Sequence, residues 1–319
     1  MVGVEQRPLG SSGLSVGEIG LGCMSMSWAY LGDAPEDESI KVIRRALELE
    51  VTLFDTADVY GPFTNEELLG RALEGRRDDA VIATKVGLVV GPSGGYPLLH
   101  DAKPERILEE IDGSLQRLRT DVIDLYYLHR VDERVPLEDT WGAMSGLVRA
   151  GKVRALGLSE VSVDELERAH AIHPVTAVQS ELSLWTRDAL PEIVPWCAAN
   201  GAAFVPFAPL GRGFLTGAIT AASFEDADFR AQNPRFTPEA IAANLAIVER
   251  VRAVAERHGA TAAQVALGWV LARGDHVIPI PGTKRRTYLE ENVGAAALRL
   301  TSDDLTELET LPAAFGSRY

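Results

Sequence analysis

The sequence lacks the features that mark membrane and secreted proteins. It contains no apolar run long enough to span a bilayer. Its first residues lack the basic and apolar regions of a signal peptide. Two cysteines in 319 residues make no disulfide framework. We therefore expect a cytoplasmic protein without a membrane-spanning helix.

Metal-binding and phosphate-binding signatures are also missing. The six histidines are scattered, with no His-x-x-x-His or Cys-x-x-Cys pair, and no Walker-type loop is present. We therefore expect no metal. Positive charge is scarce, and the net charge is −15. Such an excess repels nucleic acid and anionic membranes, so we expect neither as a partner. An anionic ligand would need a local cluster of positive charge.

What the sequence does contain is a regular alternation of short apolar runs with longer amphipathic stretches. We predict a hairpin at about 7–16, followed by strands at 19–22, 51–54, 81–84, 122–128, 153–158, 177–178, 203–207 and 277–280. Helices are predicted at 65–73, 104–118, 137–149, 163–171, 189–199, 240–257, 262–272, 285–297 and 303–311, with another around residues 40–47.

This alternation predicts an α/β fold with a parallel sheet, and eight strands close a (β/α)8 TIM barrel. The expected barrel carries an N-terminal β-hairpin and additional C-terminal helices. An open doubly wound sheet is the alternative, but it would need a glycine-rich turn after its first strand, and the GLGCMS sequence at 20–25 lacks the third glycine. No linker or repeat divides the chain, so residues 1–319 are expected to form one domain. The long loop at 210–238 is its main insertion.

In such a barrel the active site lies at the carboxyl ends of the strands. The residues that follow the predicted strands are Asp55, Tyr60, Lys85, His129, Ser159, Glu160, Gln179 and Phe207. Each alone has an ordinary structural explanation. Lys85 and Asp55 could be a structural ion pair, and His129 could be a hydrogen-bonded core residue. Their shared position favours a site.

The chemistry of this set suits a carbonyl group. A tyrosine has an unperturbed pKa of about 10, and the ammonium of Lys85 would stabilise the Tyr60 phenolate and lower that pKa. Asp55 would hold Lys85 in place, and His129 would orient a carbonyl oxygen or share the proton relay. The set therefore fits protonation of a carbonyl oxygen while its carbon accepts a hydride. It lacks a nucleophile beside a base, which argues against acyl transfer.

A hydride requires a cofactor, and the best candidate for a cofactor-binding segment lies at residues 281–292. We expect Thr283 to cap a helix whose first turn contains Lys284, Arg285 and Arg286. Cations at that end oppose the helix dipole, so their presence favours a bound anion. A solvated charged face is the alternative. A phosphate clamp of this charge favours NADPH over NADH, because NADPH carries an additional 2′-phosphate.

Taken together, these motifs resemble the aldo-keto reductases over roughly residues 9–297. The resemblance rests on GLGCM, FDTADVYG, ATK, LHR, GLS, QSE, APLGRGFLTG, and IPGT through EEN. It implies that Tyr60 is the general acid, assisted by Lys85, Asp55 and His129. It also implies an NADPH/NADP+ site. Its nicotinamide end would consist of Gly22, Cys23 and Met24 beside the nicotinamide, Ser159, Glu160 and Gln179 at its amide, and Phe207 against its ring. The rest of the cofactor would contact Leu210, Gly211 and Arg212 at the pyrophosphate, Gly282, Thr283, Lys284 and Arg286 at the adenosine phosphate, and Glu291 and Asn292 at the adenine.

One position departs from many relatives, which have Asn where this sequence has Glu160. An ionised Glu cannot donate to the carboxamide oxygen as Asn does. The Gly-Leu-Ser-Glu sequence is similar to a bacterial branch and to plant perakine-reductase-like members. Loop residues of the same branch are Arg230, Asn233, Pro234, Arg235 and Phe236, and we expect this loop to fold over the cofactor.

We expect the substrate to be a small carbonyl compound. An aromatic pocket wall of Trp28, Tyr30, Tyr96 and Trp185 suits aromatic or aliphatic aldehydes and ketones. The predicted function is NADPH-dependent reduction of aldehydes and ketones. The alternatives are a nicotinamide-sensing regulatory protein on the same fold and a Schiff-base lyase using Lys85, against which Asp55 argues because it keeps the lysine protonated.

Overall fold

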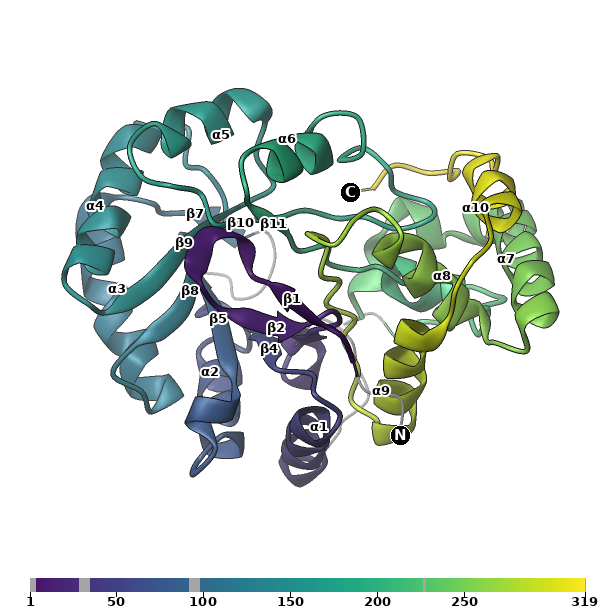
Figure 1. Ribbon diagram of the computed structural model, residues 1–319, viewed down its shortest axis with the longest axis horizontal. Coiled ribbons are helices and arrows are strands. Elements are labelled where there is room, and N and C mark those ends of the chain that lie inside the picture. The colour runs from purple at the N-terminus through teal and green to yellow at the C-terminus, as the bar shows by residue number, and fades with distance from the viewer. Residues whose placement is uncertain (1–3, 29–34, 92–97, 226–227, 319) are drawn as a thin grey trace.

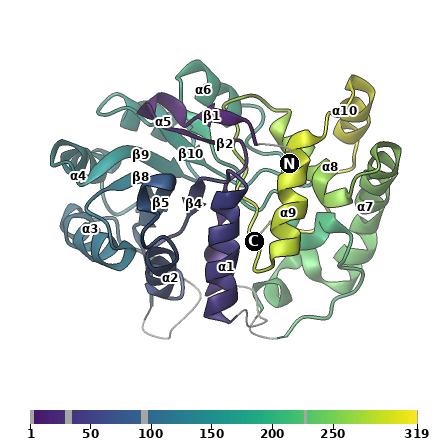
Figure 2. The same cartoon turned by 60° about the horizontal axis from the view of Figure 1, so that its bottom comes forward.

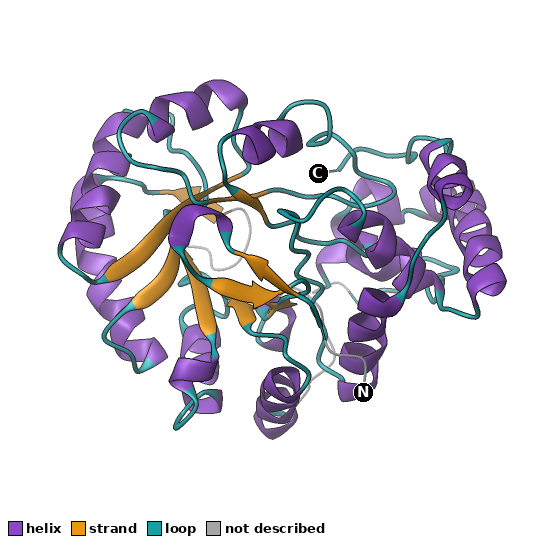
Figure 3. Ribbon diagram, viewed as in Figure 1, coloured by secondary structure: helices purple, strands orange, loops and turns teal. Residues whose placement is uncertain are grey.

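The computed structural model describes residues 4–28, 35–91, 98–225 and 228–318. A curled parallel sheet forms its centre, with helices around the outside (Figure 1, Figure 3). Among the described residues the sheet has seven strands in the order β11-β10-β9-β8-β5-β4-β3. They are β3 (Leu21–Gly22), β4 (Leu53–Asp55), β5 (Val81–Val86), β8 (Ile123–Leu128), β9 (Val153–Ser159), β10 (Ala177–Gln179) and β11 (Ala203–Phe204). The predicted α/β barrel is confirmed.

The eighth predicted strand, at 277–280, closes the ring without forming a continuous ladder. Phe204 bridges Val277 on one side, and Gly22 bridges Gly282 on the other. On the β3 side, the amides of Gly20 and Gly22 donate to the carbonyls of Pro279 and Pro281 at 2.9 and 3.4 Å. Proline has no N–H to return such a bond. On the β3 side the barrel therefore closes at a seam across which Pro279 and Pro281 accept hydrogen bonds but donate none.

The outer layer consists of amphipathic helices that bury one face against the sheet. They are α1 (Glu36–Glu48), α2 (Thr64–Ala72), α3 (Pro104–Leu118), α4 (Leu137–Arg149), α5 (Val163–His170) and α6 (Ile193–Ala199), followed by α7 (Pro238–His258), α8 (Ala262–Leu271), α9 (Arg286–Val293) and α10 (Ser302–Glu309). In α3, for example, Ile107, Ile111 and Leu118 are buried at helical spacing. Figure 2 shows α1 beside α9, where the first and last parts of the layer meet.

The N-terminal hairpin covers the amino ends of the strands. It pairs β1 (Gln6–Pro8) with β2 (Ser15–Gly17), and Leu9 and Val16 are buried in the cluster that fills the barrel. Gly10 lies so close to the barrel wall that a Cβ on it would be 2.1 Å from the carbonyl oxygen of Thr176. The hairpin therefore leaves only the carboxyl ends of the strands for a site.

A second hairpin, not predicted from the sequence, follows β5. It pairs β6 (Leu88–Val90) with β7 (Leu98–His100) in antiparallel fashion. The long loop after β11 contains short 3-10 turns at Gly211–Thr216, Phe229–Gln232 and Pro234–Phe236. Both insertions emerge from the carboxyl side of the sheet.

Candidate active site

Lys85 lies at the centre of the predicted catalytic group. It is the fifth residue of β5, and its side chain points into the barrel with 0% exposure. Its Nζ is 2.5 Å from Asp55 Oδ1, at the end of neighbouring β4, and 2.8 Å from the carbonyl oxygen of Thr56. The Tyr60 hydroxyl lies 3.3 Å from the same Nζ. Residues predicted from two neighbouring strand ends, Asp55 and Tyr60 after one and Lys85 after the other, therefore meet at one ammonium group.

Burial lowers the pKa of Lys85, and the charge of Asp55 opposes that shift. A lysine of this kind donates hydrogen bonds but releases its proton more readily than an exposed one. It can stabilise an anion that forms on the Tyr60 oxygen. The arrangement is therefore suited to proton transfer at that oxygen.

His129 follows β8 and completes the group. Its backbone N–H donates to the carbonyl of Val86 at 2.8 Å, which fixes it at the strand end. Its ring meets the Tyr60 ring edge-on, with centroids 5.7 Å apart. Burial, reinforced by the positive charges of Lys85 and Arg130, lowers the pKa of His129 well below its usual value. The imidazole is therefore neutral at pH 7, and its Nδ1 has no hydrogen-bond partner in the described part of the chain.

The three residues expected at a nicotinamide amide lie side by side at the ends of β9 and β10. Gln179 Nε2 donates to Asp55 Oδ2 at 2.7 Å, so it is linked to the catalytic group. Ser159 Oγ accepts from the guanidinium of Arg130 at 3.1 Å. Glu160 has a left-handed backbone with φ 56°, and its Oε1 accepts from the backbone N–H of Glu181 at 2.9 Å.

Glu160 also binds Arg318, a residue that the sequence reasoning missed. The Arg318 guanidinium donates to the second carboxylate oxygen of Glu160 and lies over the ring of Phe207, 5.7 Å from its centroid. Phe207 is half-buried and packs against the cluster inside the barrel. No sequence signal marks Arg318, because it lies more than a hundred residues from both partners.

The turn after Phe207 has an unusual backbone. Ala208, Gly211, Arg212 and Gly213 all have positive φ. The backbone N–H groups of Gly211 and Gly213 donate within this turn, to the carbonyls of Ala208 and Leu210 at 2.9 and 3.1 Å. Leu210 is half-buried beside them, and the Arg212 guanidinium is buried and pairs with Glu181 at 3.1 Å. The pyrophosphate site expected at Leu210, Gly211 and Arg212 stays a prediction.

The aromatic residues expected around a substrate occupy different surroundings. The ring of Trp28 lies 6.0 Å from that of Tyr60. Trp185 instead stacks on Phe214 with centroids 4.7 Å apart, beneath the long loop, and only 4% of it is exposed. Little of its ring is open to a substrate. Tyr30 and Tyr96 lie outside the described residues.

The basic segment at 281–292 departs from the expectation in one respect. Helix α9 begins at Arg286, and Thr283 Oγ1 accepts from the backbone N–H of Arg285 at 3.1 Å, before the helix. Thr283 therefore closes a turn and does not cap the helix. Lys284 and Arg285 precede the helix, and of the three cations only Arg286 lies in its first turn. The expected placement of all three in that turn was wrong because the helix starts later than predicted.

The remaining expected cofactor residues border this segment. Gly282 bridges Gly22, which places the start of the segment beside Cys23 and Met24. Met24 packs near Tyr60, and burial raises the pKa of the Cys23 thiol far above its usual range. Asn292 is buried in α9, and the carbonyl of Glu291 accepts from Gln264. The bridge between Gly22 and Gly282 thus brings the two groups of expected cofactor residues together at the strand ends.

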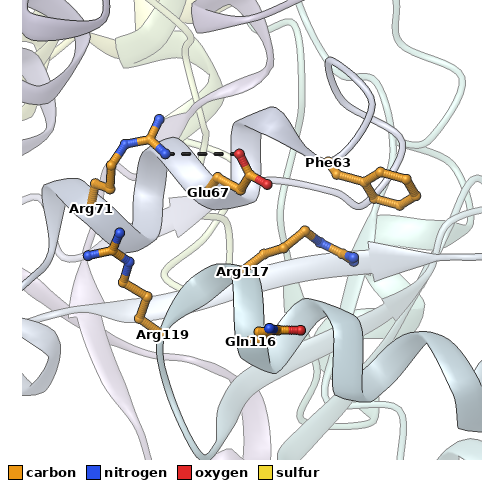
Figure 4. Close-up of a pocket in the computed structure, with 6 residues that line it drawn as sticks. All are labelled: Phe63, Glu67, Arg71, Gln116, Arg117 and Arg119. Carbon is orange, nitrogen blue, oxygen red and sulfur yellow. Dashed lines mark ion pairs between the residues drawn. The ribbon is translucent and has the colours of Figure 1, made fainter.

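A groove of about 430 Å³ lies elsewhere, between α2 and α3 in the helical layer. It is lined by Phe63, Glu67, Arg71, Gln116, Arg117 and Arg119 (Figure 4). Each of its arginines is paired with a carboxylate: Arg71 with Glu36, Arg117 with Glu66 and Arg119 with Glu74. It therefore offers no unpaired charge and lies apart from the strand ends.

No cluster of three or more histidine, cysteine or acidic side chains within the described ranges could hold a metal ion. No helix in these ranges is both long and apolar enough to cross a membrane.

Comparison with known proteins gives consistent results. The model of the Aldo/keto reductase family matches residues 18–312. Probable aldo-keto reductase 1 from Glycine max is 45% identical, over 99% of this chain and 92% of that protein. The glycerol dehydrogenase AKR11B4 from Gluconobacter oxydans is 28% identical, with a TM-score of 0.87 over 95% of this chain and 94% of that one. An aldo-keto reductase from Klebsiella pneumoniae, solved in complex with NADPH, has the same fold at 24% identity, with a TM-score of 0.74 over 97% of this chain and 95% of its own. The chain belongs to the aldo/keto reductase family.

Proposed function

We propose that the protein reduces aldehydes and ketones to alcohols with NADPH and that Tyr60 is the general acid. The observation that carries this proposal is the convergence of Asp55, Tyr60 and Lys85, with the Tyr60 hydroxyl 3.3 Å from Lys85 Nζ. Bound NADPH supplies the hydride that the carbonyl carbon accepts. Tyr60 gives its proton to the carbonyl oxygen, and water returns a proton to the phenolate.

The other residues of the group support that transfer. Lys85 stabilises the phenolate, and Asp55 keeps the ammonium in place at 2.5 Å. The neutral imidazole of His129 orients the carbonyl oxygen through a ring N–H. Lys85 already donates to three oxygens, which leaves no free amine for a Schiff base and disfavours the lyase alternative.

The residues present fit the cofactor in charge. Lys284 and Arg286 provide local positive charge in a chain of net charge −15, and we assign the pyrophosphate to Leu210, Gly211 and Arg212. We assign the nicotinamide end to Gly22, Cys23, Met24, Ser159, Glu160, Gln179 and Phe207, and the adenosine end to Gly282, Thr283, Lys284, Arg286, Glu291 and Asn292. The half-buried Trp28, with Tyr30 and Tyr96, is assigned to the substrate side.

The decisive experiment is turnover of Y60F with an aromatic aldehyde, followed by NADPH absorbance. We expect kcat to fall by roughly a hundredfold to ten-thousandfold, because the proton donor is lost, while the Kd for NADPH stays within about twofold. Y126F is a matched control, since the Tyr126 hydroxyl is buried without a hydrogen-bond partner in the described structure. Wild-type turnover in Y60F would refute the assignment of the acid. Tight NADPH binding without turnover of any carbonyl by wild type would favour the sensor alternative.

A further inference from the structure

The residues that follow α10 return to the carboxyl ends of the strands, and Arg318 reaches the proposed nicotinamide end of the site. In Figure 1 this segment runs from α10 back toward β10 and β11. Arg318 donates from one guanidinium nitrogen to Glu160 and from Nε to Glu181 Oε2 at 2.8 Å. Its guanidinium also lies over Phe207. It therefore contacts two of the residues assigned to the nicotinamide.

The backbone of this segment is held by side chains of the long loop and α7. Asn244 exchanges two hydrogen bonds with the backbone of Phe315, at 2.8 and 3.0 Å. Arg235 donates to the carbonyl of Gly316 at 3.2 Å, and Asn233 to the carbonyl of Arg318 at 3.0 Å. The backbone of Phe315, Gly316 and Arg318 is thus held in place. The position of the Arg318 guanidinium follows from the fold of the loop.

Arg318 neutralises Glu160 within a cluster of ion pairs at this end of the site. Two carboxylates, Glu160 and Glu181, meet two guanidiniums, Arg212 and Arg318, and Arg130 and Arg235 border the cluster. The Glu181 and Arg212 side chains are 0% and 4% exposed, and those of Glu160 and Arg318 15% and 20%, so water screens these charges only in part. The formal charges of the four paired groups cancel. Without Arg318, the carboxylate of Glu160 would have no ion-pair partner among the described residues.

We propose that Arg318 is a specificity-determining residue that sets the relative affinity of the site for reduced and oxidised cofactor. The inference rests on the proposed function. The nicotinamide ring is neutral in NADPH and positively charged in NADP+. A carboxylate beside it would favour the oxidised form, whereas the Glu160–Arg318 pair is neutral overall, as an asparagine would be. Arg318 thereby makes a glutamate compatible with a reductase site.

The test measures the Kd of NADPH and of NADP+ by calorimetry, without substrate, for wild type, R318A, E160Q and the double variant. R318A leaves a negative charge, so we expect the preference for NADP+ over NADPH to rise about tenfold, as a partly screened unit charge allows. E160Q leaves a positive charge and shifts the preference the opposite way. The double variant returns toward the wild-type ratio. R299A is the control, because Arg299 is exposed and pairs with Glu5.

A purely structural Arg318 would behave differently. It would change both affinities by one factor and leave their ratio unchanged in R318A, and the double variant would be at least as impaired as either single one. That result would overturn the inference. R318K keeps the charge and should keep the ratio within about twofold, which separates charge from packing. If wild type and R318A bind neither cofactor, the proposed function fails and the inference fails with it; binding with equal ratios overturns the inference alone.

Discussion

At the scale of single residues, position along a strand decided which acidic groups belong to the site. Asp55 and Asp58 lie three residues apart, yet Asp55 pairs with Lys85 and Asp58 points elsewhere. Both Asp58 carboxylate oxygens are buried with no hydrogen-bond partner that the structure describes. Burial, reinforced by the charges of Glu66 and Glu110, raises the pKa of Asp58 well above its usual range. Asp58 is therefore neutral in the folded protein over a range of pH in which the unfolded chain ionises it.

D58N is accordingly expected to stabilise the protein, and more so as the pH rises. Because the pKa is raised in the folded state, stability falls as the pH rises from the unfolded value of about 3.9 to the folded value, and asparagine avoids that loss. We expect a gain of at least about 1 kcal/mol in the free energy of unfolding at pH 8, and a smaller one at pH 4.5. Urea unfolding at both pH values measures it, with the exposed Asp121 changed to Asn as control. A loss of stability at pH 8 would contradict the prediction.

The sequence allowed the four central residues to be predicted because Asp55, Lys85 and His129 directly follow apolar runs and parallel strands bring such residues together. Tyr60 comes shortly after the same run as Asp55. Lys85 and Asp55 meet as expected. Arg318, Asn233 and Arg235 could not be placed in this way. Their contacts join segments far apart in the chain, and these segments lack regular secondary structure and hence any periodicity.

At the scale of elements, periodicity predicted α3 and α4 to the residue, because both begin after or at proline and bury a regular apolar face. The sequence predicted the eighth strand and the start of α9 less accurately. Pro279 and Pro281 remove the donors of a ladder, and the Thr283 turn delays the helix. The hairpin of β6 and β7 was missed although its signal exists: GPSGG at 91–95 separates two short apolar runs.

The N-terminal hairpin gives a test at this scale, because two of its glycines differ only in their surroundings. Both have positive φ, but a Cβ would strike the wall of the barrel at Gly10 and meet nothing within 4 Å at Gly13. We expect G13A to lower the free energy of unfolding by about 1–2 kcal/mol, because only the left-handed backbone is strained. G10A should lower it by at least twice as much, because its Cβ also clashes with the barrel wall. Chemical unfolding of both variants measures this. Equal losses would show that the hairpin does not pack against β10 and β11 as described.

At the scale of the whole molecule, the distribution of charge matters more than its sum. The net charge of −15 opposes any phosphorylated ligand, whereas Lys284 and Arg286 attract one locally. Lys284 is half-buried and Arg286 is exposed, so part of this attraction is open to screening by salt. The preference between NADPH and NADH therefore depends on ionic strength.

We expect the ratio of the Kd for NADH to that for NADPH to fall as NaCl is raised from 0.02 to about 0.5 M, because salt screens the additional phosphate. The double variant K284A/R286A should start with a lower ratio, reduced by about tenfold or more, and should depend less on salt. R119A, in the groove of Figure 4, removes one arginine far from the strand ends and serves as the control. A ratio that salt leaves unchanged in wild type would contradict a phosphate clamp.

The seam between β3 and the segment at 277–282 has a consequence for how the molecule moves. A closed barrel opens locally where the fewest hydrogen bonds must break. Here Pro279 and Pro281 lack the backbone N–H groups that would donate across the seam to β3. Gly22 and Gly282 face each other across that line, and the residues assigned to the two ends of the dinucleotide begin on either side of it. A ligand that contacts both sides of the seam opposes its opening. Binding of the cofactor would therefore also make the whole barrel more rigid.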